Sequence, residues 1–343
     1  MHEGTQPKMI RVLFTKPFHK NDQAYLSERV HGSIEFITPD TFDVEGVLAR
    51  LSESDVLFGG MVNEQVLSKG SHLKLIQIPW NGIDNLDFEM ISRYSVPICN
   101  SHSNAGVVAE HAVGMLMALA KKLPYHDSLL RQNKWNRVSP NGNTVSPFSK
   151  KLQNARILYV GFGAIARHCA KMLSGFDMDV SVVNTSGALP DDSTVPINTA
   201  FSMDEISEAV KGHDFILLAL PLTSRSRGMI SGPVFEAMDD KTVLVNISRG
   251  DIIDEKALYD ALDSGKLGGA AIDTWYNYPK PGTPEVSPSS EYNFGQFPHM
   301  LMSPHRAGYA EGGLPHLDDG ISNLNSLVAG TPFKNLVDTK KRY

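Results

Sequence analysis

The sequence is poor in cysteine and has no apolar run that approaches the length of a membrane span. Its two cysteines, Cys99 and Cys169, each lie inside an apolar segment, so neither a disulfide framework nor a cysteine-based metal site is expected. None of its twelve histidines has another one four residues away, the spacing at which a helix presents two metal ligands. The polar first residues do not resemble a signal peptide. We therefore predict a cytoplasmic protein that binds no metal and does not enter a membrane.

Charge is not concentrated in runs either. The chain has 32 basic and 38 acidic residues, for a net charge of −6, and its longest basic run is 340–342. A nucleic acid or an anionic membrane surface is therefore not an expected partner. The 41% hydrophobic and 20% charged residues are typical of an ordinary globular enzyme, and 343 residues suggest two domains.

What the sequence does contain is a glycine turn between two apolar runs. Residues 156–160 have the character of a buried strand; Gly161, Gly163 and Ala166 follow, and a second apolar run occupies 180–184. Gly161 permits a tight turn, Gly163 lets the backbone approach a bulky ligand, and Ala166 lets a helix pack against the sheet. The free N–H groups at the start of that helix suit a pyrophosphate. The whole segment therefore predicts a dinucleotide-binding unit.

Short apolar runs alternate with amphipathic runs on both sides of this turn. Before it we expect strands at 9–14, 55–58, 75–78 and 96–99, and helices at 44–51, 64–69 and 88–94. After it we expect strands at 215–220, 243–247, 269–272 and 300–302, a helix opened by the capping box 202–205, a helix at 255–264 capped by Asp254, and a final helix at 321–328. The alternation predicts an α/β fold in which helices cover parallel sheets.

Four stretches stand out from this alternation. The helix at 107–120 is apolar on most faces, so it is buried either between domains or at a subunit interface. Residues 133–151 are polar and predict an irregular connection, whereas the proline-rich stretch 274–298 indicates a functional loop. The loop 79–84 follows a strand, where parallel sheets bind their ligands.

Several motifs together resemble the D-isomer-specific 2-hydroxyacid dehydrogenase family, in particular its glyoxylate and hydroxypyruvate reductases. They are Gly-Ile-Asp at 82–84, Val-Ala-Glu-His at 108–111, the glycine turn, Leu-Pro-Leu-Thr at 220–223, the stretch 246–258 and Ser-Pro-His at 303–305. The resemblance covers nearly the whole chain.

This resemblance implies two Rossmann-like domains with doubly wound parallel sheets. A dinucleotide-binding domain at 103–308 would be inserted into a flavodoxin-like substrate-binding domain, formed by 1–102 and completed by 309–343. The active site would be the cleft between them, closing on hinges near 101–106 and 306–311. A homodimer formed through the helix at 107–120 is also implied.

By the same resemblance, Arg249 grips the keto oxygen and the carboxylate of the substrate, and His305 is the general acid–base group. A guanidinium suits the first role because its planar fork stays charged and meets oxygens in pairs. The remaining substrate-binding residues would be Trp80, Asn81, Gly82 and Asn104, with the backbone N–H groups of Asn81 and Gly82 holding the carboxylate. NAD or NADP would supply the hydride chemistry. The residues expected to bind it are Val108, Gly161, Gly163, Ala164, Ile165, Asn184, Thr185, Leu220, Pro221, Ile247, Asp273 and Gly308, with Asp273 and the main chain near Ile247 orienting the nicotinamide carboxamide.

Without the resemblance, these residues have plainer interpretations. Arg249 would be a solvated turn residue, and His305 would be a structural histidine. His111, on the apolar helix, is expected to be a satisfied core or interface histidine.

The first departure from the family pattern is Tyr278, counted as a third catalytic residue, which stands where the family has a glutamate. In the family that glutamate hydrogen-bonds the histidine, and its negative charge raises the histidine pKa. Tyr278 brings no charge at neutral pH, so we predict a lower pKa for His305 and a reductase activity that falls off at a lower pH. Glu285 and Glu291, on the proline-rich loop, are candidates to replace the missing acid.

The second departure is Asn184, which precedes Thr185 at the end of a strand where an acid normally binds the ribose hydroxyls of the adenosine. Loss of that carboxylate removes repulsion toward a 2′-phosphate. No arginine follows to bind one, and Asp191 and Asp192 lie just beyond. NAD and NADP both stay open, with NADP tolerated rather than required.

Two other functions stay open beside our main prediction, which is reduction of a small 2-keto acid, glyoxylate- or hydroxypyruvate-like, to the D-2-hydroxy acid. The run 273–279 is also similar to formate dehydrogenases, in which an uncharged glutamine takes the place of Tyr278 and oxidation needs no proton transfer at the substrate. A dinucleotide-sensing interaction protein without catalysis, on the same scaffold, would need neither Arg249 nor His305.

Overall fold

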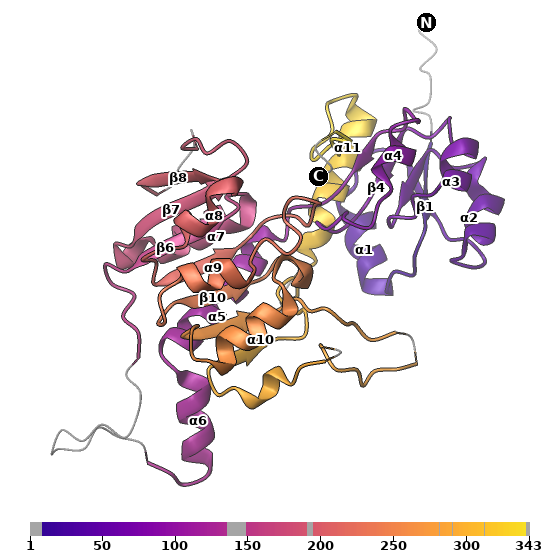
Figure 1. Cartoon of the computed structure of the whole chain (residues 1–343). Coiled ribbons are helices and arrows are strands. Elements are labelled where there is room, and N and C mark those ends of the chain that lie inside the picture. The colour runs from indigo at the N-terminus through magenta and orange to yellow at the C-terminus, as the bar shows by residue number, and fades with distance from the viewer. Residues whose placement is uncertain are drawn as a thin grey trace, which may run out of the picture. The chain divides into compact units, whose positions relative to one another are not determined.

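The protein is described here by a computed structural model that covers residues 9–135, 149–190, 195–280, 282–289, 291–311 and 313–340. Most of the expected irregular connection at 133–151 lies outside these residues, as do Asp191 and Asp192. The chain divides into two compact units (Figure 1). Unit 1 comprises 1–104 and 310–343, and unit 2 comprises 105–309.

Unit 1 is built on a five-stranded parallel sheet in the order β2-β1-β3-β4-β5. This is the flavodoxin-like strand order. The strands are β1 (Ile10–Phe14), β2 (Ile34–Ile37), β3 (Val56–Phe58), β4 (Leu75–Gln77) and β5 (Ile98–Cys99). The helices are α1 (Lys20–Arg29), α2 (Val44–Leu51), α3 (Glu64–Lys69), α4 (Phe88–Ile91) and α11 (Asp318–Ala329).

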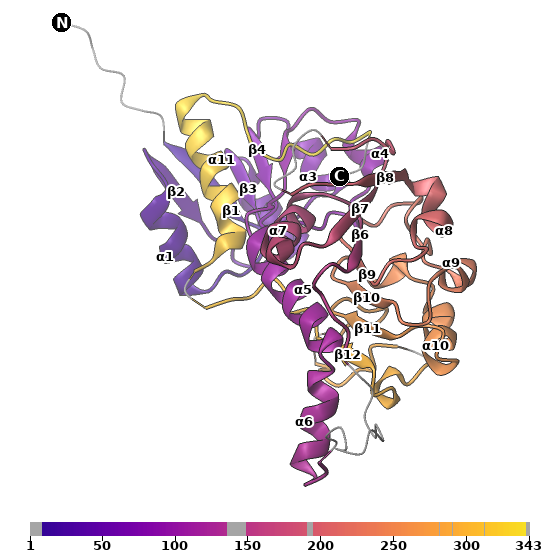
Figure 2. The same cartoon turned by 90° about the vertical axis from the view of Figure 1, so that its left-hand side faces the viewer.

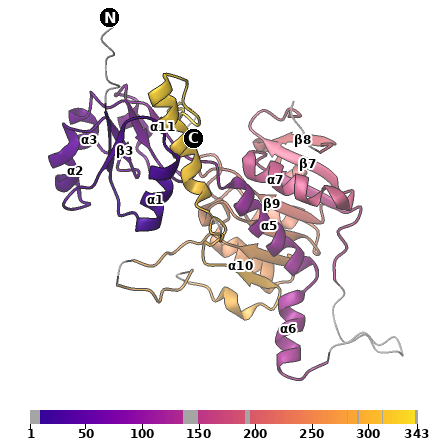
Figure 3. The same cartoon turned by 180° about the vertical axis from the view of Figure 1, so that it is seen from behind.

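Helices cover both faces of this sheet. Because successive residues of a strand point to opposite faces, each strand contributes side chains to two separate cores. Val12 and Phe14 of β1 share a core with residues of α1 and α11, including Leu26 and Ile321. Leu13 faces the opposite core, to which α2, α3 and α4 contribute. Figure 3 shows α2 and α3 on one side of β3 and α1 and α11 on the other.

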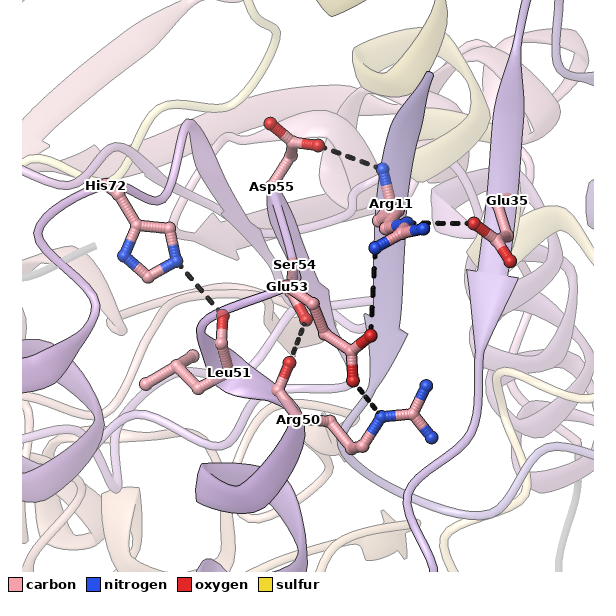
Figure 4. Close-up of polar contacts among 8 residues, drawn as sticks. All are labelled: Arg11, Glu35, Arg50, Leu51, Glu53, Ser54, Asp55 and His72. Atoms are coloured by element: carbon pink, nitrogen blue, oxygen red, sulfur yellow. Dashed lines mark hydrogen bonds and ion pairs between the residues drawn. The ribbon is translucent and has the colours of Figure 1, made fainter.

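The amino end of the unit 1 sheet carries a network of charges (Figure 4). The Arg11 guanidinium donates to Glu35 at 2.9 Å and lies 3.7 Å from Glu53, which also pairs with Arg50. The Arg11 backbone N–H donates to Asp55 at 3.0 Å. These charges are partly exposed and neutralise one another, so each pair contributes about 0–1 kcal/mol.

Unit 2 is built on a seven-stranded parallel sheet in the order β12-β11-β10-β9-β6-β7-β8. Its strands are β6 (Arg156–Val160), β7 (Asp179–Asn184), β8 (Thr199–Ser202), β9 (Phe215–Leu218), β10 (Val243–Asn246), β11 (Gly269–Ile272) and β12 (Met300–Met302). The order reverses between β6 and β9. In a doubly wound sheet this switch point is where a ligand binds, beyond the carboxyl ends of the strands.

Two layers of helices cover the unit 2 sheet (Figure 2). On one face lie α5 (Ala105–Ala120) and α7 (Ala164–Leu173), and on the other lie α8 (Ile206–Ala209), α9 (Gly232–Ala237) and α10 (Glu255–Asp263). The apolar helix expected at 107–120 is thus α5, packed against α7 and β10. It is followed by α6 (Leu123–Arg131). The residue before this helix, Lys122, has a left-handed backbone conformation. Across the described parts of the chain, no helix is long and apolar enough to cross a membrane.

The expected fold class is confirmed, and the errors concern individual elements. The bounds of α2 and α3 match the prediction, and the caps at Ser202 and Asp254 are present. The helix expected at 88–94 ends at Ile91. The elements α1, α6, α9, β2 and β8 were not predicted. In α1 only Leu26 is buried, so that helix has almost no apolar stripe to reveal it.

Candidate active site in the second unit

The glycine turn lies at the switch point of the unit 2 sheet. Gly161 follows β6 with φ +85°, and a Cβ at this position would lie 2.5 Å from the carbonyl oxygen of Ala219, which follows β9. Only glycine fits there without strain. Gly163 has an ordinary φ of −84°, and nothing lies within 4 Å of the place where its Cβ would stand. Gly161 is therefore required by the fold, whereas the fold does not explain Gly163.

The amino end of α7 is open to an anion. Gly163 is the N-cap residue, no side chain caps this ten-residue helix, and Ala164 and Ile165 form its first turn. The loop after β9 borders the turn. There the Leu220 N–H donates to the Ser248 hydroxyl at 3.1 Å, which in turn donates to the Leu218 carbonyl at 2.8 Å. Pro221 follows this anchored residue.

Asn184 organises its own turn at the end of β7. Its side-chain oxygen accepts from the N–H groups of Ser186 and Gly187, at 3.0 and 2.8 Å, and its NH₂ donates to the Ala188 carbonyl at 2.7 Å. An aspartate could make the first two bonds but not the third. The structure of this turn therefore explains why an amide stands at position 184 instead of a carboxylate. Thr185 beside it is exposed.

Arg249 stands in a tightly built loop after β10. The Asn246 side chain accepts from the Ser248 N–H at 2.9 Å and donates to the Arg249 carbonyl at 2.8 Å. At the next residue, Gly250, a Cβ would lie 2.6 Å from the Trp275 backbone. The loop that carries Arg249 thus lies directly against the end of β11, while Ile247 before it is buried.

Asp273, at the end of β11, holds the loop that follows β12. Its carboxylate is 1% exposed. It accepts from the Ser303 hydroxyl at 2.5 Å and from the backbone N–H groups of Arg306 and Ala307 at 2.8 and 3.2 Å. Because these anchors flank His305 on both sides, Asp273 fixes the backbone from which the His305 side chain projects. Gly308 follows in the turn that closes with a Tyr309 N–H bond to Arg306.

His111, expected to be a satisfied core or interface histidine, is hydrogen-bonded and joins this network from α5. Its Nε2 lies 3.0 Å from the Ser303 hydroxyl oxygen and 3.6 Å from Asp273. Because the single Ser303 proton goes to Asp273, the His111 Nε2–H must be the donor to Ser303. Neither His111 nor Ser303 was predicted as a site residue. Val108, one turn earlier on α5, is buried.

His305 and Tyr278 lie side by side. The centroids of their rings are 5.5 Å apart. His305 has φ +56°, an uncommon value for a residue other than glycine. The Tyr278 hydroxyl oxygen accepts from the Trp275 N–H at 3.0 Å, and the Trp275 indole donates to the Ser303 carbonyl at 2.7 Å. Tyr278 therefore connects the end of β11 to the ring of His305.

The other expected substrate residues belong to unit 1. Trp80, Asn81 and Gly82 form the loop after β4, which is held by a Ser101 N–H bond to the Trp80 carbonyl (3.1 Å) and an Asn100 side-chain bond to the Asn81 carbonyl (2.7 Å). Asn104 is the last residue before α5. Among the residues that the structure describes, no group of three or more histidine, cysteine or acidic side chains is arranged to hold a metal.

Residues 113–307 match the family profile described as D-isomer specific 2-hydroxyacid dehydrogenase, NAD binding domain. A D-3-phosphoglycerate dehydrogenase of Methanocaldococcus jannaschii is 30% identical over 312 residues, which are 88% of this chain and 54% of the relative. A hydroxypyruvate reductase of Thermotoga maritima is 28% identical over 70% of this chain and 75% of its own length. The chain spans about half the length of the first curated relatives that it matches.

Among solved structures, a D-isomer specific 2-hydroxyacid dehydrogenase of Xanthobacter autotrophicus in complex with NADPH and MES has a similar fold. The TM-score is 0.77 at 19% identity, covering 98% of this chain and all of the other. At this identity the likeness concerns the fold alone.

Proposed function

The chain belongs to the D-isomer specific 2-hydroxyacid dehydrogenase family, and we propose that it is an NAD(P)-dependent oxidoreductase that interconverts a small 2-keto acid and its D-2-hydroxy acid. The observation that carries the proposal is the convergence of three strand-end loops, from β10, β11 and β12. They bring Gly250, the residue after Arg249, against the Trp275 backbone, and His305 next to Tyr278.

In the reductive direction, we propose that the Arg249 guanidinium binds the keto oxygen and the carboxylate of the substrate. A fixed, permanently charged fork stabilises the negative charge that develops on that oxygen. His305 donates the proton that the oxygen takes up. When bound, the nicotinamide supplies the hydride. Asp273, through its bonds to the loop 303–307, keeps the imidazole in place, and Tyr278 holds one face of the ring.

The residues of the glycine turn fit a dinucleotide. The uncapped first turn of α7 offers N–H groups to a pyrophosphate, and the open space at Gly163 lets a bulky group approach the backbone. Asn184 and Thr185 would face the adenosine ribose. Because Asn184 carries no charge, we propose that the protein accepts NADH and tolerates NADPH.

Two matched glycine variants test the cofactor site. Gly163→Ala should leave the melting temperature of the free protein unchanged but weaken NADH binding, by about tenfold or more, since the methyl group occupies only the ligand's space. Gly161→Ala should lower the melting temperature, because its Cβ meets the Ala219 backbone. Thermal unfolding and NADH fluorescence titration measure both effects. Unchanged NADH affinity in Gly163→Ala would argue against the site.

The activity is tested by mixing the protein with NADH or NADPH and a panel of 2-keto acids that includes glyoxylate and hydroxypyruvate, and following absorbance at about 340 nm. We expect turnover by the wild type and a loss of about 100-fold or more in His305→Ala, because general acid catalysis contributes on that scale. Turnover that is undiminished in His305→Ala would remove His305 from the mechanism.

Tyr278 brings no charge to His305, so two other functions, which need no acid–base group at the substrate, are tested in the same assay. Oxidation of formate with NAD⁺, without 2-keto acid turnover, would support a formate-dehydrogenase-like enzyme, for which no acid–base group is needed at the substrate. Dinucleotide binding without turnover of any substrate would support a sensing protein.

We further propose a homodimer formed through the helix at 107–120 (α5), as the resemblance implies, with the apolar side chains exposed on α6 and after it adding to the interface. Leu123, Leu130 and Trp135 are 57%, 50% and 76% exposed, although each is a large apolar side chain. Groups of this kind commonly mark a protein interface. Analytical ultracentrifugation should give the mass of a dimer, and Leu130→Glu should shift it toward the monomer.

A further inference from the structure

At the carboxyl edge of the unit 1 sheet, a lysine lies against two aromatic rings. Lys16 follows β1, and its Nζ is 4.5 Å from the centroid of the Trp80 ring and 5.2 Å from that of Phe18. An ammonium group is attracted to the face of an aromatic ring at such distances. Trp80 follows β4, so both side chains stand at the edge where parallel α/β sheets bind ligands.

The backbone makes room for this arrangement with two consecutive glycines after β3. A Cβ at Gly60 would lie 2.6 Å from the Trp80 ring, and one at Gly59 would lie 3.1 Å from the Lys16 side chain. The φ values of +87° at Gly60 and +136° at Gly59 also favour glycine. The Thr15 hydroxyl oxygen accepts from the Met61 N–H at 3.2 Å, which ties the loops after β1 and β3 together.

The Lys16 ammonium has no acidic partner within 4 Å among the residues that the structure describes. Asp22 acts on it only at longer range, and the Asp22 carboxylate already accepts from the His19 N–H at 3.1 Å. Partial burial lowers the pKa of Lys16, with Asp22 opposing that shift. Water has thus been partly removed from a cation without a carboxylate taking its place. Such a group gains most from an anionic ligand.

We propose that Lys16, resting on Trp80, binds a second anionic group of the substrate, so that the preferred substrates are 2-keto acids with a carboxylate or a phosphate at the far end. The inference rests on the proposed function. The family resemblance implies that the first carboxylate of that substrate binds the backbone N–H groups of Asn81 and Gly82, which follow Trp80 in the same unit. A substrate with one negative charge leaves nothing for Lys16, whereas a second anion pairs with the ammonium while Trp80 supports the carbon chain.

Two substrate pairs that differ only in the terminal group test the proposal. They are 2-oxoglutarate against 2-oxovalerate, and 3-phosphohydroxypyruvate against hydroxypyruvate. In Lys16→Met, whose unbranched side chain can still cover Trp80, kcat/KM should fall by about tenfold or more for the doubly charged member of the preferred pair, and by less than about twofold for its singly charged partner. Lys16→Arg should retain most of the preference. The pair that responds distinguishes a carboxylate from a phosphate.

Lys20→Met is the matched control, because Lys20 is exposed at the start of α1 and its loss changes the net charge equally. An equal loss on both members of each pair, or no loss on either, would overturn the proposal. If the wild type reduces none of the four compounds, calorimetric titration with 2-oxoglutarate and 2-oxovalerate separates the two claims. Binding of only the former, abolished in Lys16→Met, would keep the anion site and reject the proposed activity. Absence of such binding would reject the site.

Discussion

Replacing Asp273 by asparagine should loosen the loop that carries His305. The carboxylate now accepts from the Ser303 hydroxyl and from the N–H groups of Arg306 and Ala307. The single carbonyl oxygen of an asparagine can serve the first two donors, which share one oxygen of the aspartate. Its NH₂ group then faces the Ala307 N–H, donor against donor.

The size of the effect follows from these contacts. A hydrogen bond to a charged group contributes about 1.5–3 kcal/mol, and a buried donor left without an acceptor costs about 1–3 kcal/mol. Removing the charge of a side chain that is 1% exposed recovers part of its dehydration cost, which works in the opposite direction. We therefore expect the free energy of unfolding to fall by about 3 kcal/mol, equivalent to about 6–12 °C in melting temperature for a unit of this size.

The assay combines thermal unfolding with the kinetics of 2-keto acid reduction. In Asp273→Asn, kcat/KM should fall by about 100-fold, because a displacement of roughly 1 Å in a catalytic group has that cost. Asp263→Asn, an exposed carboxylate at the end of α10, is the control for lost charge. A melting temperature and a kcat/KM equal to those of the control would refute the reasoning. A higher KM for the dinucleotide alone, at unchanged stability, would instead favour a contact between Asp273 and the nicotinamide.

Three other predictions concern buried thiols, a buried imidazole and Tyr278. Burial raises the pKa of the Cys99 and Cys169 thiols to about 12, so neither should react with a disulfide reagent at pH 8 until the protein is denatured; fast labelling of the native chain would contradict this. Burial lowers the pKa of His213 below its ordinary 6.5, so the unfolded chain binds this proton more readily. Stability should therefore fall as the pH decreases below about 6.5, and less steeply in His213→Phe, as measured by urea unfolding at several pH values. In Tyr278→Glu, a carboxylate favours the protonated imidazole of His305, so the alkaline decline of the reductase rate should move to higher pH; an unchanged profile would show that residue 278 does not set it.

Local chemistry made much of the dinucleotide unit predictable. The glycine turn, the cap at Asp254 and the apolar strands are each encoded by residues close together in the sequence, so their patterns are visible without coordinates. The two strands that were not predicted are short and lie at the edges of their sheets. In β2 only Ile37 is buried, and β8, at the edge of its sheet, has no fully buried residue. A strand with so little apolar burial has no alternation to detect.

The candidate site was only partly accessible from the sequence. Arg249 and His305 were proposed by resemblance, since nothing near them distinguishes a catalytic side chain from a turn residue. The bond from Asp273 to Ser303 spans 30 positions, and that from Ser303 to His111 spans 192. Contacts between residues so far apart are fixed by the order of strands in the sheet and not by local patterns, so His111 could not be recognised as a partner of this loop.

The same limit applies to unit 1, where charge is distributed differently at the two edges of one sheet. At the amino end, Arg11 faces Glu35 and Glu53 within ion-pair distance, so that edge is neutralised and offers a ligand little charge (Figure 4). At the carboxyl end, Lys16 lies on Trp80 with no acid within 4 Å among the described residues. Within the part of the chain that the structure describes, Arg11 is already paired with acidic side chains, whereas Lys16 is not. Of these two cations, Lys16 is therefore the one that can pair with an anionic ligand. Substitutions at Arg11, which takes part in two such pairs, should therefore change stability by at most about 2 kcal/mol and leave substrate preference intact, whereas those at Lys16 should change the preference.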